Sequence, residues 1–374
     1  MAGPSTTAVH GVAEPHNGAV GTPIYQSSTF LYPELADGSK APYIYSRYEN
    51  PTNEAVEGTL AKLEGAKHAL LYASGLAAVQ GILQVKKGEG IAIQRGIYGG
   101  TVALLQEEYR GLGVPIHVLD EVTPPTSLPT GTVWVWMESI TNPLLRVADI
   151  AAWAKAAHAA GARLVVDATF ATPLGQRPLE LGADVVMHSA TKALGGHSDL
   201  LAGVAITNDD DLRQSLWRRR RNLGATLDPH TAWLLGRGLK TIALRVQRQC
   251  ENAMAVALFA QNLGITVHYP GLPSHPDHKS SKAILQTFGG VVTLDVGSLA
   301  AAQAFRRAVK IIVPAASLGG VESLVSLPAE TSHAYLDEGA RKAMGISDGL
   351  LRLSCGIEDT EDLVADLKQA LSNL

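Results

Sequence analysis

From about residue 60 to residue 210, short apolar runs alternate with segments in which apolar positions recur every three or four residues. The short runs are typical of strands buried on both faces. The longer segments 99–113 and 147–161 have helical spacing, and the second closes on Gly161, a residue favoured where helices end. This alternation predicts an α/β fold with a mostly parallel sheet covered by helices. The predicted strands are 68–73, 90–94, 115–119, 132–138, 163–169 and 184–190.

The two ends of the chain depart from this pattern. Residues 1–45 are rich in Gly, Pro, Ser and Thr, which predicts an extended arm that needs a partner surface to become ordered. Residues 231–264 predict one long helix, and the apolar and helical segments beyond it indicate a smaller α+β region. We therefore expect an arm at 1–45, an α/β domain at 46–243 and an α+β domain at 244–374.

Composition narrows the functional classes. The chain has 374 residues, 46% of them hydrophobic, which is typical of a globular protein with two domains. The formal net charge of −4 gives no general attraction to nucleic acid or to an anionic membrane. No apolar run is long enough to span a bilayer, and the N-terminus lacks the pattern of a secretory signal. Cys250 and Cys355 form no disulfide framework. We expect a cytoplasmic protein.

Two predicted strands end on residues suited to ligand binding, and ligands of open α/β sheets gather at the carboxyl ends of strands. Ser74, Gly75 and Leu76 follow the first strand and open a helix. Backbone N–H groups at such a helix start favour an anion, although ordinary turns use the same residues. Asp167 ends another apolar run. It is a candidate helix cap, metal ligand or partner for a cationic ring nitrogen.

The last predicted strand leads into the sequence HSATK, residues 188–192. Ser189 and Thr191 offer hydroxyls to phosphate oxygens, while a buried Lys192 would lose part of its preference for the charged form and become a nucleophile. On its own, Lys192 also fits an ordinary surface lysine. Together with Asp167 and the turn at 74–76, it favours pyridoxal phosphate. That cofactor needs an aldehyde-binding lysine, an acid at its ring nitrogen and a phosphate site.

Competing motifs are weaker. No GxGxxG sequence follows a predicted strand, which argues against an oxidoreductase that binds NAD. The sequence GHSDL lacks the second glycine of a serine-hydrolase elbow. His275 and His278 have no third ligand nearby, so we predict a polar loop there and no metal site. The basic run 218–221 predicts a solvated or interface face.

Eight motifs, taken in order along the chain, resemble the Cys/Met-metabolism family of pyridoxal-phosphate enzymes, which includes cystathionine γ-synthase, cystathionine γ- and β-lyases and methionine γ-lyase. The resemblance runs nearly end to end. It implies fold-type I, the aspartate aminotransferase-like architecture of PLP-dependent transferases. The motifs are PIYQSSTF, YSRYENPT, YASGLAA, IYGGT, VVDATFATP, HSATKALGGHSD, SLGGVESL and LRLSCGIED.

The same resemblance implies roles for individual residues. Lys192 would hold the cofactor aldehyde and act as the base, and Asp167 would keep the ring nitrogen protonated. Tyr98 would stack on the ring and help the leaving group depart. The implied cofactor contacts are Lys192, Asp167, Ser74, Gly75, Leu76, Tyr98, Thr169, Ser189 and Thr191, with Tyr45 and Arg47 from the neighbouring subunit of a homotetramer of catalytic dimers. The implied substrate contacts are Arg352, Ser317, Asn142, Tyr45, Glu322 and Ile44.

The implied reaction is γ-elimination or γ-replacement on a sulfur amino acid. Glu322 lies in a stretch similar to cystathionine γ-lyases, which places that activity first, beside cystathionine γ-synthase. Ile44 replaces an acid that is common in relatives handling cystathionine, which favours methionine γ-lyase as the alternative, but Gly100 stands where methionine γ-lyases typically have cysteine. A non-catalytic scaffold with the same fold is the alternative from another class.

Overall fold

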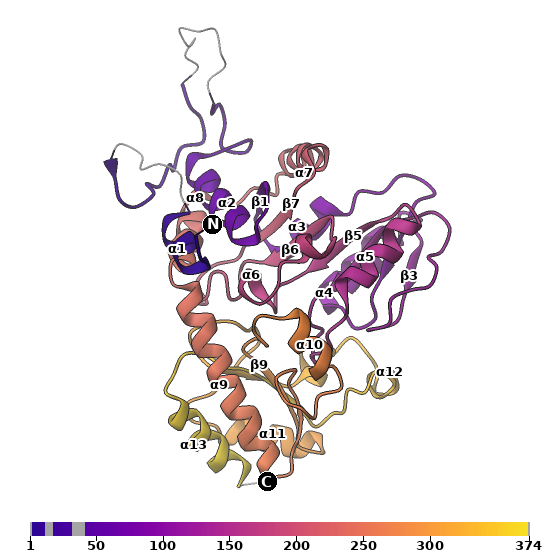
Figure 1. Cartoon of the computed structure of the whole chain (residues 1–374), viewed down its shortest axis with the longest axis vertical. Helices are drawn as coiled ribbons and strands as arrows, with labels where there is room; N and C mark the ends of the chain where they lie inside the picture. Colours follow the sequence, from indigo (N-terminus) through magenta and orange to yellow (C-terminus); the bar gives the residue numbers. More distant parts are fainter. Residues whose placement is uncertain (1, 12–17, 32–41, 373–374) are drawn as a thin grey trace.

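The computed structural model describes residues 2–11, 18–31 and 42–372. Its larger sheet has seven strands in the order β1-β7-β6-β5-β4-β2-β3 (Figure 1). β2 to β6 are mutually parallel where they pair, and β7 runs antiparallel to both β1 and β6. The strands are β1 (His68–Tyr72), β2 (Gly90–Ile93), β3 (Ile116–Val118), β4 (Thr132–Glu138), β5 (Arg163–Asp167), β6 (Val185–Ser189) and β7 (Gly203–Thr207).

Helices cover both faces of this sheet, as the alternation of elements predicts. Neighbouring residues on a strand bury their side chains on opposite faces: Val165 packs in the cluster with α3 and α7, whereas Val166 packs with α5. A further cluster joins α2 and α8 to β1, β6 and β7. The helices are α2 (Pro51–Glu64), α3 (Gly75–Ile82), α4 (Gly99–Leu104), η2 (Leu105–Tyr109), α5 (Ile150–Ala159), α6 (Thr172–Gly175), η3 (Pro178–Leu181), α7 (Asp210–Leu223) and α8 (Pro229–Leu239).

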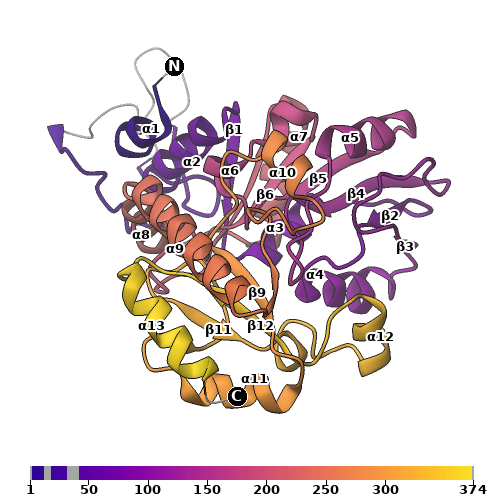
Figure 2. The same cartoon turned by 60° about the horizontal axis from the view of Figure 1, so that its bottom comes forward.

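The second part of the chain is built on a five-stranded sheet in the order β10-β11-β12-β9-β8. One apolar cluster lies between this sheet and its helices, and it includes Ile140 and Ala171 from the larger part. Figure 2 shows the long helix α9 leading from α8 down along this sheet. The elements are α9 (Ile242–Asn262), β8 (Thr266–His268), α10 (His278–Ile284), β9 (Val291–Asp295), α11 (Leu299–Ala308), β10 (Val313–Pro314), β11 (Leu324–Ser326), η4 (Pro328–Glu330), α12 (Glu338–Ala343), β12 (Leu350–Ser354) and α13 (Thr360–Leu371).

Several local predictions need correction. The expected single helix over 231–264 is two helices, because α8 ends at Leu239 and α9 starts at Ile242. Within the arm, residues 4–10 form helix α1 (Pro4–His10), while 12–17 and 32–41 lie outside the described residues. β3 is a partly exposed edge strand and is not buried on both faces. The expected second domain boundary falls in the first turn of α9.

The described residues contain no helix that is both long and apolar enough to span a membrane. They also contain no cluster of three or more side chains that could ligate a metal. His275 lies in the predicted loop, although it is nearly fully buried, whereas His278 begins α10, so the loop prediction is wrong for His278.

Candidate active site

A cavity of about 660 Å³ lies where the carboxyl ends of β4, β5 and β6 face the smaller sheet. Residues from both parts of the chain line it, which is a common position for small-molecule sites. Twelve of the sequence-predicted residues meet there: Ser74, Gly75, Leu76, Tyr98, Asn142, Asp167, Thr169, Ser189, Thr191, Lys192, Ser317 and Arg352.

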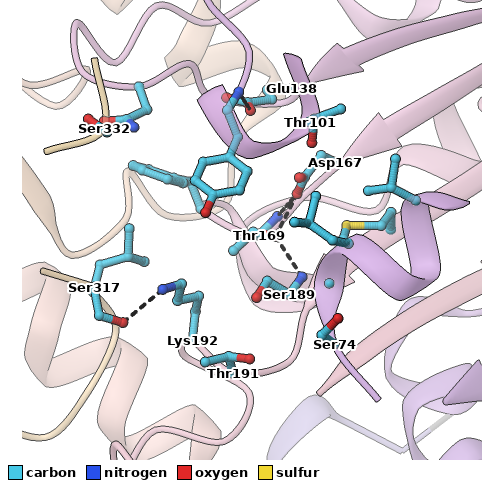
Figure 3. Close-up of a pocket in the computed structure, with 18 of the residues that line it drawn as sticks. Ser74, Thr101, Glu138, Asp167, Thr169, Ser189, Thr191, Lys192, Ser317 and Ser332 are labelled. Carbon is cyan, nitrogen blue, oxygen red and sulfur yellow. Dashed lines mark hydrogen bonds between the residues drawn. The ribbon is translucent and has the colours of Figure 1, made fainter. Parts of the chain in front are cut away.

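Lys192 reaches into this cavity from the turn that follows β6. Its Nζ donates a hydrogen bond to Ser317 Oγ at 2.8 Å, as Figure 3 shows. Burial, aided by the nearby charge of Arg352, lowers the pKa of this amine to about 8. A substantial fraction of Lys192 is therefore neutral near physiological pH, as a nucleophile or base requires.

Asp167 ends β5 and faces the same cavity. Its Oδ1 accepts hydrogen bonds from the backbone N–H of Thr169 at 3.0 Å and from the Thr169 hydroxyl at 2.5 Å. Thr169 Oγ1 also accepts from the backbone N–H of Ser189 at 2.8 Å, which ties the ends of β5 and β6 together (Figure 3). Because Thr169 holds the carboxylate by two donors, Asp167 is fixed in direction as well as position.

The start of α3 forms another wall of the cavity. Ser74 is the N-cap of this helix, and its side chain accepts a hydrogen bond from the backbone N–H of Ala77. A Cβ atom at Gly75 would approach the Ser189 side chain to 3.2 Å, so the glycine leaves room for close approach to the helix start. The Thr191 hydroxyl instead exchanges hydrogen bonds with the backbone of Ala202. It can donate to a phosphate only by giving up its bond to the Ala202 carbonyl.

Arg352 projects from β12 and is 6% exposed. Its Nη1 donates to Asn142 Oδ1 at 3.2 Å and its Nη2 to the Ser317 carbonyl at 3.1 Å, while Nε has no partner among the described residues. Ser317 has a φ of +96°, a conformation that non-glycine residues rarely adopt outside constrained sites. Burial lowers the pKa of Arg352 to about 10, so it stays cationic and suits a carboxylate.

Tyr98 precedes α4, and 49% of the residue is exposed. Its backbone N–H donates to Glu138 Oε1 at 2.5 Å. Glu138 is a buried residue of the cavity wall that the sequence interpretation missed. It is the last residue of an apolar strand, the same signal that pointed to Asp167.

Four predicted residues do not line the cavity: Ile44, Tyr45, Arg47 and Glu322. The Arg47 guanidinium lies over the rings of Tyr45 and Tyr48, at 5.4 and 5.0 Å from their centroids. The Glu322 carboxylate accepts a hydrogen bond from the Ser198 hydroxyl. A single chain therefore does not bring these four side chains to Lys192.

Comparison with known proteins identifies the family. Residues 5–372 match the model of the Cys/Met metabolism PLP-dependent enzymes. The chain belongs to that family. It is 39% identical to cystathionine γ-lyase of Bacillus subtilis, over 99% of each chain. It is 40% identical to cystathionine γ-synthase of Mycobacterium tuberculosis (strain H37Rv), over 99% of this chain and 97% of that protein.

The family's solved structures agree with the architecture. A cystathionine γ-lyase from Micromonospora echinospora superposes with a TM-score of 0.94 and 38% identity, over the full length of both chains. The predicted fold class, fold-type I with a large mostly parallel sheet and a smaller α+β part, is confirmed. The protein is accordingly a PLP-dependent enzyme of a family that acts on carbon–sulfur bonds.

The chemistry of the cavity residues fits pyridoxal phosphate, independently of the family match. A partly desolvated amine at Lys192 and a doubly hydrogen-bonded carboxylate at Asp167 meet in one cavity, beside the helix start that Gly75 keeps open. Arg352 adds a buried cation whose Nε–H group has no partner among the described residues, as a carboxylate-bearing substrate requires.

Proposed function

We propose that the protein is a cystathionine γ-lyase, which converts cystathionine and water into cysteine, 2-oxobutanoate and ammonia in the cytoplasm. The observation that carries this proposal is the meeting of Lys192, Asp167 and Arg352 in one cavity of a chain from this family. The γ-lyase from B. subtilis, matched over 99% of both chains, supports this choice among the family's reactions.

In this proposal, each side chain acts on a defined atom. When bound, pyridoxal phosphate supplies an electron-accepting ring. Lys192 would hold the cofactor aldehyde, and its neutral amine would take the proton from the substrate Cα. Asp167 would keep the ring nitrogen protonated. The N–H groups of Gly75 and Leu76 and the Ser189 hydroxyl bind the phosphate, with Thr191 after loss of its Ala202 bond and with Ser74 shaping the turn.

The substrate is held at its α-carboxylate by Arg352. Asn142 and the Ser317 carbonyl already fix the guanidinium through Nη1 and Nη2, which leaves the Nε–H group for the ligand. Ser317 also positions Lys192 through its hydroxyl. Tyr98, in the wall of the same cavity, would contact the bound ring and assist departure of the sulfur. Glu322 would recognise the distal end of the substrate after a rotation away from Ser198.

A substrate panel tests this function. Purified enzyme with PLP is assayed with cystathionine, methionine, homocysteine, and O-acylated homoserine plus cysteine. We expect the highest kcat/KM for cystathionine, with cysteine and 2-oxobutanoate formed in equal amounts. Formation of pyruvate and homocysteine would identify a β-lyase, and cystathionine production from the acylated substrate would identify a γ-synthase. Lys192→Ala serves as the inactive control.

Methionine γ-lyase activity is the second candidate, and Ile44 favours it. This half-buried apolar side chain offers no partner for the distal ammonium of cystathionine. We expect Ile44→Glu to raise the ratio of kcat/KM for cystathionine to that for methionine by about fivefold, the effect of one partly exposed ion pair. Ile44→Gln matches the new side chain in size without its charge, so an equal ratio in both variants would remove residue 44 from substrate selection.

We further propose a homotetramer built from two catalytic dimers. Tyr45 and Arg47 lie outside the cavity of their own chain, and their side chains are exposed. In the dimer, the segment that joins the arm to the α/β domain of one subunit would bring both side chains to the phosphate of the other. A planar guanidinium suits that anion.

A further inference from the structure

Two acidic residues at the ends of adjacent strands line the cavity. Glu138 ends β4, Asp167 ends β5, and the two residues are paired in register across the parallel strands. Figure 3 shows both side chains among the residues that line the cavity. Glu138 is only 5% exposed. The proposed function uses Asp167 and leaves the neighbouring acid without a role.

The hydrogen bonds of the two acids differ. Asp167 Oδ1 accepts from two donors of Thr169, an amide and a hydroxyl. Glu138 Oε1 accepts from the amide of Tyr98, whereas its buried Oε2 has no partner among the described residues. Hydrogen bonds to a carboxylate stabilise its charged form, and an unpartnered buried oxygen does not. The surroundings therefore favour the negative charge on Asp167.

Burial and the neighbouring acids also favour the protonated form of Glu138. Burial is the main cause that raises the pKa of Glu138 well above its ordinary value, and the acids Asp167 and Glu121 raise it further. Tyr335, from the segment before α12, interacts electrostatically with Glu138, and burial is the main cause that raises the pKa of its phenol. Burial also raises the pKa of Asp167, but the Thr169 hydrogen bonds and, as the smallest cause, the electrostatic influence of His188 oppose that rise. Two adjacent acids in a site largely shielded from water do not readily ionise together.

We propose that Glu138 is a neutral carboxylic acid that positions Tyr98 and leaves Asp167 as the single negative charge facing the cofactor ring. Its Oε1 accepts from the Tyr98 amide and fixes the start of α4. Its other oxygen carries the proton, so no second negative charge competes with Asp167 for the protonated ring nitrogen. Glu138 is thus a positioning residue. The inference rests on the PLP site of the proposed function and not on the choice of sulfur substrate.

Infrared spectroscopy of the holoenzyme tests the protonation state. At pH 7, the difference spectrum of wild type minus Glu138→Gln should contain the C=O stretch of a protonated carboxylic acid. The matched difference for Asp167→Asn, recorded in the Glu138→Gln background so that residue 138 cannot change its ionisation, should contain carboxylate bands only. Carboxylate bands alone in the Glu138 difference would overturn the proposal, as would an acid C=O band in the Asp167 difference.

Cofactor affinity tests the positioning role without any turnover. Glu138→Gln keeps a neutral group with an acceptor for the Tyr98 amide, so its dissociation constant for PLP should stay within about threefold of wild type. Glu138→Ala removes the acceptor and should weaken binding about tenfold, the effect of one lost hydrogen bond. The visible absorption and circular dichroism of the bound cofactor should be altered in Glu138→Ala and should match wild type in Glu138→Gln.

Two other results of the PLP affinity measurement would contradict the proposal. Equal weakening in the Gln and Ala variants would show that a negative charge is needed at residue 138, and wild-type affinity in the Ala variant would exclude a positioning role. Either result overturns the proposal. The denaturation midpoint of each variant identifies a folding defect. Because no arm uses a sulfur substrate, failure of the cystathionine assay leaves this test intact.

Discussion

The amine of Lys192 has lost part of its contact with water, and this changes its chemistry before any ligand binds. Burial lowers its pKa to about 8 from 10.5, so the neutral form at pH 7 is about 300-fold more abundant than in an ordinary lysine. The attack on an aldehyde uses the neutral amine. We expect the rate of covalent PLP attachment to apoprotein to rise with pH and level off above about 8.

Stopped-flow absorbance between pH 6.5 and 10 measures this attachment rate, with Lys192→Met as the control that cannot form the bond. A rate that keeps rising to pH 10 would show an ordinary lysine and contradict the role of burial. Ser317 contributes to the same environment because its hydroxyl accepts the Lys192 hydrogen bond.

Residues that end buried strands could be found from the sequence, since a polar side chain after an apolar run is conspicuous. Asp167 was found in this way, and Glu138 carries the same signal. Arg352 and Asn142 are different, because they lie 210 residues apart and meet only through the packing of β12 against the larger part. A local sequence pattern cannot indicate such a contact, and these two residues were predicted only from the family resemblance.

At the scale of elements, helix α7 shows how packing overrides composition. The run 218–221 predicts a solvated or interface face, yet Arg220 is 3% exposed and is bonded within its own chain. Its guanidinium donates to Glu57 Oε1 at 2.5 Å, to the Leu71 carbonyl at 3.0 Å and to the Tyr48 carbonyl at 3.3 Å. The prediction is therefore wrong for Arg220, which joins α2, β1 and the segment that carries Arg47.

Arg220→Met should destabilise the protein by about 3 kcal/mol, because it leaves the largely buried Glu57 carboxylate without its cation. Arg218→Met, in the same turn but at an exposed position, should change stability by less than about 0.5 kcal/mol. Urea denaturation at a fixed subunit concentration measures both. Equal losses of stability in the two variants would show that the Arg220 contacts stabilise the protein no more than an exposed arginine does.

Other elements could be predicted to different degrees for physical reasons. β1, β2 and β4 to β6 are compact apolar runs, which their burial requires, and all were found. The break between α8 and α9 was missed because apolar spacing continues across Lys240 and Thr241. β7 was overlooked although its five residues are all buried, and its antiparallel pairing with β1 and β6 is a tertiary property that no local pattern encodes.

At the scale of the whole molecule, the proposed site needs two chains. Lys192 and Asp167 lie in one cavity of one chain, whereas Arg47 is stacked on tyrosines outside it. Subunits with Arg47→Ala and with Lys192→Ala should each be nearly inactive. When they are mixed under conditions of subunit exchange, each hybrid dimer contains one intact site. Random pairing should then restore about a quarter of the wild-type activity.

The matched control mixes Asp167→Ala with Lys192→Ala. Both defects lie in the same cavity of a chain, so every site in the hybrid carries one of them and activity should not return. Native mass spectrometry with subunits of different mass verifies that hybrids form in both mixtures. Hybrids that form without recovering activity in the Arg47 mixture would place Arg47 in the site of its own chain. Recovery in the control would instead mean that Lys192 and Asp167 serve different sites, contrary to their shared cavity.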